Sequence, residues 1–265
     1  MADLSPQERL RQRADLAVTV CSRAEIESFF NETANDVLMG LARNPYLQEH
    51  DLLRLLERKD LAYGVIQELA RHKTVQRSYA VQLALVRHPK APRQVSLPLM
   101  KFLYIFDLLS VAQTPGVPAD VKMVAEEAIL RKLAALPRGQ RMSLARRGTG
   151  RLAASLLVDS DEELIYAALD NPYLTEGLLL KVLARKDLPP AVVDHIARHP
   201  RWSHHYYLRL ALIRNPLTPF ARVLAFLPDI AVTDLRDICL DHRMHRQVRK
   251  YIEAHCTARL KKSGQ

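Results

Sequence analysis

The chain contains a long internal repeat, and this repeat constrains the fold more than any single motif. Residues 44–97 align without a gap with residues 171–224 at an offset of 127, and 24 of the 54 aligned pairs are identical. Asn-Pro-Tyr-Leu at 44–47 recurs at 171–174, Arg-Lys-Asp-Leu at 58–61 recurs at 185–188, and Ala-Arg-His at 70–72 recurs at 197–199. Two copies of one sequence predict two copies of one local structure.

The composition and the apolar spacing both predict helices. Hydrophobic residues make up 48% of the chain, whereas aromatic residues make up 6% and only eight of the 265 residues are glycine. Leu52, Leu55 and Leu56 recur at the three- and four-residue spacing of a helix face. Proline follows Asn44, His88, Asn171, His199 and Asn215, and ends a helix at each of these corners because it disfavours helical geometry in its predecessor.

Short helices whose apolar faces need a neighbouring unit predict an all-α chain folded as an α-solenoid. The expected organisation has N-terminal capping helices in 1–35, a first repeat block in 36–137 and a basic connecting helix in 138–162. A second repeat block with a C-terminal capping helix follows in 163–265. Ser5, Pro6 and Glu8 form the start signal of the first helix.

Three segments carry a family resemblance. They are Leu-Ala-Arg-Asn-Pro-Tyr-Leu at 41–47, Asp-Ser-Asp-Glu-Glu-Leu-Ile-Tyr-Ala-Ala-Leu-Asp-Asn-Pro at 159–172 and Leu-Ile-Arg-Asn-Pro-Leu-Thr-Pro at 212–219. Over roughly 36–255 the chain resembles the leucine-rich repeat variant family and its HEAT-like relatives. The resemblance implies a right-handed stack of short helices that binds other macromolecules. The N-terminal cysteine cluster of an iron–sulfur member of that family is missing here, so no cofactor is expected.

The net charge of +10 is concentrated in two segments. Residues 128–158 hold seven basic side chains and no acidic one, and residues 241–265 hold seven basic side chains against Asp241 and Glu253. The basic surface that these segments predict comprises Arg138, Arg141, Arg146, Arg147, Arg151, Arg246, Arg249 and Lys250. Such a surface could bind nucleic acid by displacing counterions from phosphates, as in a HEAT-like DNA-repair glycosylase.

A second set of basic residues lies just before the corners: Arg43, Arg71, Arg87, Arg198 and Arg214. In a solenoid these positions stack along one edge and form a ladder of guanidinium groups suited to carboxylates or phosphates. Arginine at a helix C-terminus also has a purely structural use, because it interacts with the unpaired carbonyl groups there. Trp202, near Tyr206 and Tyr207, is either a binding hot spot or a filler between helices.

Two further motifs give weak hypotheses. Cys239, His242 and His245 are three residues apart, which invites a metal site, but a catalytic zinc site needs three converging ligands. Arg147-Gly148-Thr149-Gly150-Arg151 is similar to a phosphate-binding nest but lacks the lysine and serine or threonine of a P-loop. Neither a metal nor a catalytic constellation is predicted, so we expect the protein not to be an enzyme.

These observations together predict a cytoplasmic interaction scaffold. Cys21, Cys239 and Cys256 are scattered and odd in number, which argues against a disulfide framework. The chain shows neither a secretory signal pattern nor an apolar run of membrane-spanning length, so no membrane insertion is expected. We expect a protein partner that is acidic or extended, bound at the concave face or the arginine-bearing edge, with nucleic acid as the alternative and no small-molecule substrate.

Overall fold

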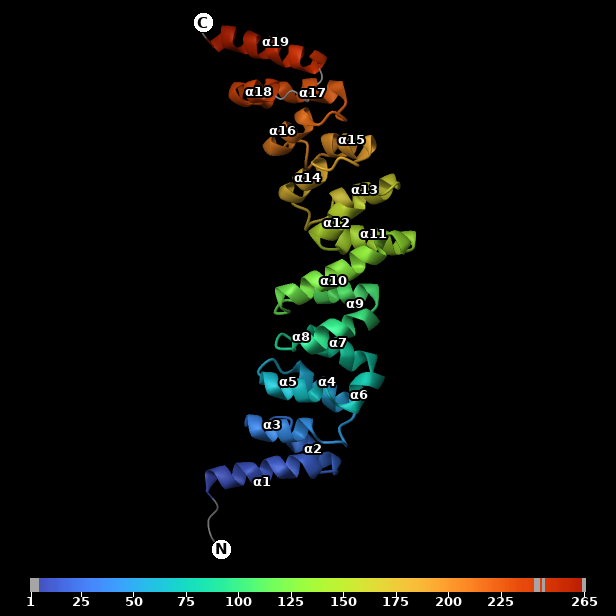
Figure 1. Cartoon of the computed structure of the whole chain (residues 1–265), viewed down its shortest axis with the longest axis vertical. Coiled ribbons are helices and arrows are strands. Elements are labelled where there is room, and N and C mark those ends of the chain that lie inside the picture. The colour runs from blue at the N-terminus through green and yellow to red at the C-terminus, as the bar shows by residue number, and fades with distance from the viewer. Residues whose placement is uncertain (1–4, 241–243, 245, 264–265) are drawn as a thin grey trace. The chain divides into compact units, whose positions relative to one another are not determined.

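The computed structural model describes residues 5–240, 244 and 246–263, with side chains described as far as Arg259. Within these ranges the chain forms nineteen α-helices and three short 3₁₀ helices, and no strand (Figure 1). The all-α prediction is therefore confirmed. The chain divides into two compact units, Met1–Lys132 and Leu133–Gln265, called here the first unit and the second unit.

The first unit contains ten α-helices and one 3₁₀ helix among the described residues. They are α1 (Pro6–Thr19), α2 (Arg23–Ser28), α3 (Asn35–Ala42), α4 (Glu49–Glu57), α5 (Tyr63–Leu69), α6 (Lys73–Arg77), α7 (Tyr79–Arg87), α8 (Arg93–Leu99), η1 (Met100–Phe102), α9 (Ile105–Gln113) and α10 (Ala119–Lys132). The cap of α1 forms as the sequence predicts, because the Ser5 side chain accepts from the Glu8 N–H while the Glu8 carboxylate accepts from the Ser5 N–H.

The second unit repeats most of this plan in its described part. Its helices are η2 (Leu133–Ala135), α11 (Arg138–Arg147), α12 (Gly150–Leu156), α13 (Glu162–Leu169), α14 (Glu176–Leu183), α15 (Pro190–Arg198), α16 (Tyr206–Arg214), α17 (Phe220–Phe226), η3 (Leu227–Asp229), α18 (Val232–Cys239) and α19 (Arg246–Ser263). Each helix from α12 to α19 begins 127 residues after a helix of the first unit, as α16 does relative to α7. The counterpart of α6 is a turn at 200–204.

Neighbouring helices within each unit pack in succession. In the first unit α1 packs against α3, α3 against α5, α4 against α7, and α9 against α10. In the second unit α11 packs against α13, α12 against α14, α13 against α15, α14 against α16, and α18 against α19. The buried faces are aliphatic, with Leu52, Leu55 and Ile66 fully inside. Each helix therefore buries its apolar face mainly against helices close to it in sequence.

The side chains of Asn44 and Asn171 at the corners are buried and hydrogen-bond to backbone groups of a preceding segment. The Asn44 side chain is fully buried, and its amide donates to the carbonyl oxygens of Ala17 and Val20, both at 2.8 Å. Its carbonyl accepts from the Tyr46 N–H at 2.8 Å. Asn171 makes the corresponding contacts in the second unit. An amide both donates and accepts, so these corners serve the fold, as the helix-termination argument predicts.

The connecting segment differs from the single helix that we predicted for 138–162. It forms two helices, α11 and α12, because Gly148 and Thr149 between them have extended backbone. The Gly148 carbonyl accepts from Asn171, and a Cβ atom on Gly150 would lie 2.2 Å from the Tyr173 carbonyl oxygen. The glycines thus permit close packing. Only Gly116 has positive φ among the described residues, so 147–151 does not contain the αR–αL pair that builds a phosphate nest.

Candidate functional site

Four of the five corner arginines are engaged by neighbouring polar groups. Arg43 and Arg71 both contact the Glu68 carboxylate, at 3.3 Å and 3.2 Å. Arg198 pairs with Asp194 one turn earlier in α15, at 2.8 Å. Arg87 donates to the Ser110 hydroxyl and lies 3.7 Å from Asp107. All four keep solvent-exposed surface, and each has an acidic side chain within ion-pair distance, although Arg43 and Arg71 share the single carboxylate of Glu68.

Arg214, the last residue of α16, differs from the other four. It is exposed and makes no hydrogen bond or ion pair within the described part of the chain. It borders a hollow of about 530 Å³ beside α14 and α16. The other lining residues are Leu180, Leu183, Ala184, Arg185, Lys186, Ala211, Asn215, Pro216 and Leu217. This set includes three basic residues, and no acidic residue of the described chain lines the hollow.

The basic residues at the hollow lie at the C-terminal ends of two helices. Helix α14 ends at Leu183, and Arg185 and Lys186 follow its C-cap Ala184, while α16 ends at Arg214 before the Asn215-Pro216 turn. The Asn215 side chain joins these ends: its amide donates to the Leu183 carbonyl at 3.2 Å, and its oxygen accepts from the Leu217 N–H at 2.9 Å. The same side chain therefore fixes the spacing across the hollow.

The hollow carries a net positive charge. Arg185 donates two hydrogen bonds to Asp187, at 3.2 Å and 2.9 Å, and this guanidinium holds the pKa of the Asp187 carboxyl below its usual range. The Arg185 charge is thus offset, whereas Lys186 and Arg214 have no acidic partner among the described residues. Helix C-termini carry partial negative charge, which explains why cations gather here, but two uncompensated full charges exceed it.

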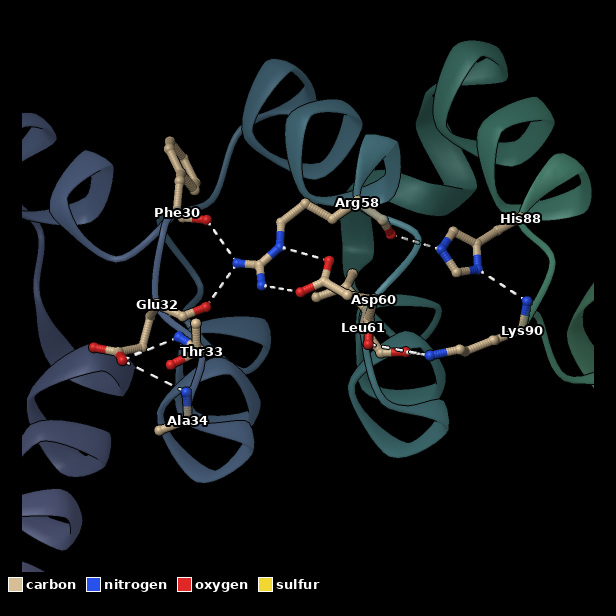
Figure 2. A network of polar contacts seen from close by, with 9 residues as sticks. All are labelled: Phe30, Glu32, Thr33, Ala34, Arg58, Asp60, Leu61, His88 and Lys90. Carbon is tan, nitrogen blue, oxygen red and sulfur yellow. Dashed lines mark hydrogen bonds and ion pairs between the residues drawn. The ribbon is translucent and has the colours of Figure 1, made fainter.

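The first unit has a polar network at the corresponding corner (Figure 2). Arg58, the counterpart of Arg185, donates from Nη1 to the carbonyl oxygens of Phe30 and Glu32, at 2.8 Å and 2.7 Å. Its Nε and Nη2 atoms donate to the two Asp60 oxygens, at 3.1 Å and 2.6 Å. One guanidinium therefore joins the turn at 58–60 to the backbone of Phe30 and Glu32, and only 20% of the Arg58 side chain is exposed.

His88 and Lys90 complete this network. His88 is fully buried, donates from Nε2 to the Arg58 carbonyl at 2.9 Å, and accepts at Nδ1 from the Lys90 N–H at 3.1 Å. Burial lowers the pKa of His88, which favours the neutral ring that can make both bonds. The Lys90 amine donates to the carbonyl oxygens of Asp60 and Leu61, at 3.1 Å and 3.0 Å.

Three substitutions between the copies distinguish the hollow from the network. Glu57, His88 and Lys90 of the first unit correspond to Ala184, Asn215 and Leu217 of the second. Alanine removes a carboxylate near the basic residues, and leucine cannot donate to the carbonyl oxygens that a lysine amine would reach. Arg185 has 41% of its side chain exposed, against 20% for Arg58, and within the described residues it donates to no backbone carbonyl as Arg58 does.

Trp202 lies in the core of the second unit. Only 2% of it is exposed, and its indole N–H donates to the Leu169 carbonyl at 2.8 Å. The Arg201 guanidinium covers the ring at 4.3 Å and donates to the carbonyl oxygens of Asn171 and Leu174. Of the two roles that the sequence left open, filling the space between helices agrees with this burial, and an exposed hot spot does not.

Two arginines of the basic segment 128–158 form ion pairs with acidic side chains. Arg138 pairs with Asp161 and Glu163, and Arg141 pairs with Asp159, all of which follow the segment directly. Arg147, Arg151 and Arg249 also interact within the chain. Arg246 and Lys250 are exposed on α19, which packs against α18, whereas α11 packs against α12 and α13. Within the second unit, α11 and α12 therefore lie at one end of the helix succession and α19 lies at the other (Figure 1).

The described residues offer no metal site. No group of three His, Cys, Asp or Glu side chains among them could hold an ion. His199 is buried and accepts from the Arg201 N–H, and burial lowers its pKa although Asp170 opposes this effect. His242 and His245, two of the proposed ligands, lie outside the described residues. Cys239 and Cys256 line a hollow of about 350 Å³, and burial raises the pKa of both thiols.

Sequence reasoning missed one exposed aromatic group in the first unit. Phe102, Tyr104 and Phe106 are 65%, 71% and 46% exposed, although they lie in the strongly apolar stretch 102–112. The corresponding residues of the second unit are Asp229, Ala231 and Thr233. This difference between the copies could have indicated that the three aromatic side chains are exposed, because a buried apolar position would more often remain apolar in both copies.

Comparison of the chain with known proteins finds no matching family model, no matching curated protein and no matching solved structure. None of the helices in the described ranges is long and apolar enough to span a membrane.

Proposed function

We propose that this protein is a non-enzymatic interaction scaffold, built as a duplicated α-solenoid of the leucine-rich repeat variant or HEAT-like kind. The ungapped sequence repeat and the recurrence of helix starts at an offset of 127 support the duplication. Packing of each helix against helices near it in sequence supports the solenoid. Its partner is an acidic, extended segment of another protein, bound at the arginine-bearing edge.

We choose an acidic partner because of one observation. Arg214 alone of the five corner arginines lacks a hydrogen bond or ion pair within the described chain, and it borders a hollow with two further cations and no acidic lining residue. An arginine fork matches the geometry of a carboxylate. The hollow therefore offers charge that the fold itself leaves uncompensated.

Nucleic acid is the second candidate, favoured by the net charge of +10 and by the exposed Arg246 and Lys250 on α19. Two observations weigh against it. Acidic neighbours pair with Arg138 and Arg141 in the other basic segment, and no aromatic side chain lines the hollow to stack on a base. Aliphatic side chains line much of the hollow, which suits a peptide better than a phosphate backbone.

The test compares two labelled probes by fluorescence anisotropy on the full chain. One is a short peptide of alternating glutamate and serine, and the other is a random-sequence DNA duplex, each at about 50 mM and about 200 mM salt. We expect saturable binding of the peptide and weaker binding of the duplex. Tighter binding of the duplex with a steep salt dependence would favour the nucleic-acid candidate, and no peptide binding at low salt would refute the scaffold for acidic partners.

A further inference from the structure

The hollow beside α14 and α16 combines two properties that the proposed scaffold function alone does not require. Arg185, Lys186 and Arg214 supply positive charge from two helix ends, and Leu180, Leu183 and Leu217 supply aliphatic surface beside it. Its volume of about 530 Å³ lies within the range of about 300–1,000 Å³ that is typical of ligand pockets. A ligand that satisfies both properties must carry an anionic group next to an apolar one.

Resting on the proposed function, we propose that this hollow is the specificity subsite of the scaffold. It takes one carboxylate side chain and a neighbouring aliphatic side chain of an extended acidic peptide. Arg214 is the main anchor, because Arg185 already donates two hydrogen bonds to Asp187 while Arg214 makes none within the described chain. Lys186 adds a second uncompensated charge at the rim.

The backbone around the subsite is held in place before any ligand arrives. The Asn215 amide bridges the two helix ends through the Leu183 carbonyl, and the Asn215 oxygen holds the Leu217 N–H. Leu183 is buried and thus fixed, whereas Leu217 is 37% exposed and can be covered by a ligand. A site on fixed elements loses less conformational entropy on binding than a flexible one does.

The first unit supplies an internal control for this assignment. At the corresponding corner the Lys90 amine is tied to the carbonyl oxygens of Asp60 and Leu61, and Arg87 is engaged by Ser110 and Asp107. Glu57 also places a carboxylate where the second unit has Ala184. We therefore expect the corner of the first unit not to bind the same peptide.

The experiment measures anisotropy of a labelled peptide of alternating glutamate and leucine on the full chain. Arg214→Ala removes the anchor, and Ala184→Glu introduces at an exposed position the residue type that the first unit has. We expect each change to weaken binding by about 10-fold or more, which corresponds to about 1.4 kcal/mol. The matched control Arg87→Ala should leave affinity within about two-fold, because its charge is already engaged.

Leu217→Ser tests the aliphatic wall separately. The original chain should prefer the glutamate–leucine peptide over the glutamate–serine peptide, and this variant should lose the preference while still binding both. Circular dichroism of every variant should match that of the original chain, and all substituted positions except Arg87 are solvent-exposed, so unfolding is not the expected cause of lost binding.

The outcomes separate the subsite from the scaffold. If acidic peptides bind and Arg214→Ala and Ala184→Glu change nothing, the subsite is wrong while the scaffold proposal stands. If neither peptide binds, both proposals fail. If the DNA duplex binds more tightly than the peptides and loses affinity in Arg214→Ala, the hollow is a phosphate site and the peptide assignment is overturned.

Discussion

Arg23 and Asp51 form an ion pair in the first unit, and Gly150 and Leu178 occupy the two corresponding positions of the second. Asp51 is fully buried and accepts two hydrogen bonds from Arg23, both at 2.7 Å, and one from the Gln48 N–H at 2.8 Å. At Gly150 a Cβ atom would lie 2.2 Å from the Tyr173 carbonyl oxygen and 2.8 Å from the Leu178 side chain. One junction is thus held by an ion pair, whereas at its counterpart a glycine packs closely against the Tyr173 backbone and the Leu178 side chain.

The corner that follows this junction in the chain also has more polar contacts in the first unit than in the second. Arg58, His88 and Lys90 join backbone segments at this corner of the first unit by hydrogen bonds. Among the described residues, the matching corner of the second unit has the Arg185–Asp187 pair and the hydrogen bonds of Asn215 in their place. A succession of helices that recurs at an offset of 127 thus tolerates exchange of its polar connections. Where these connections are lost, Lys186 and Arg214 have no acidic partner among the described residues.

The largest effect that we expect comes from making the second unit resemble the first at Trp202, whose counterpart is Val75. Trp202→Val empties a buried site and removes the hydrogen bond to the Leu169 carbonyl. The free energy of unfolding should fall by about 3 kcal/mol. Urea unfolding followed by circular dichroism measures it, because Trp202 is the only tryptophan. Unchanged stability together with weaker peptide binding would instead support an exposed hot spot.

The next effect concerns the ion pair of the first unit. Arg23→Ala leaves the buried Asp51 carboxylate without its main partner, which should cost up to about 3 kcal/mol at neutral pH. Adding Asp51→Leu, the residue type at Leu178, should restore most of this loss, since an apolar side chain needs no counter-charge. A double-mutant cycle in urea measures the coupling. Strictly additive losses would show that the two side chains do not act as a pair.

The same pair predicts a stability loss in acid. Burial alone would raise the pKa of Asp51, but the hydrogen bonds from Arg23 and Gln48 lower it below its ordinary value near 3.9. A lowered carboxyl pKa contributes stability that is present above the ordinary value and lost as pH falls through the lowered one. The Arg23→Ala, Asp51→Leu double variant should lack this part of the acid sensitivity, which titration of the urea midpoint would show.

The smallest effect is the pH dependence that His88 gives to the first unit. Burial lowers the pKa of His88 below its ordinary value near 6.5, and Lys59 and Lys90 act in the same direction, although the Arg58 carbonyl opposes them. The unfolded chain therefore binds more protons between the lowered pKa and 6.5, so stability is full above that window and falls as pH decreases through it.

His88→Asn, which places the residue type of Asn215 in the first unit, should make the urea midpoint less sensitive to pH between about 7 and about 5. The reverse change, Asn215→His, should increase that sensitivity. His72 and His199 also have lowered pKa values through burial, so some dependence remains in His88→Asn. An unchanged slope in both variants would mean that His88 does not titrate with folding.

Much of the local structure could be predicted because its causes are local. The three- and four-residue spacing of Leu52, Leu55 and Leu56 produces an amphipathic helix wherever it occurs, and proline after Asn44 ends the preceding helix. The repeat then predicted the same elements at an offset of 127. The break at Gly148 was missed, because glycine weakens a helix without specifying where the chain leaves it.

The candidate site could be predicted only in part. The sequence marked Arg214 among five equivalent arginines but could not show which of them were engaged, since Glu68 reaches Arg43 from another helix. The sequence also showed seven basic residues in 128–158. It could not show that acidic side chains after this segment pair with some of them, as Asp161 does with Arg138. Ion pairing depends on distances between segments, and charge counting along the chain does not contain those distances.

The helical class and the corners could be read from the residues alone, because hydrophobic spacing and proline act within a few residues. The positions where the two copies diverge could be read in the same way. The burial of Trp202 could not, and neither could the meeting of Arg185 and Arg214, from separate helix ends, at one hollow. Burial and electrostatic compensation depend on what packs across from a side chain, and that neighbour often lies far away in sequence, as Ala17 lies 27 residues from Asn44.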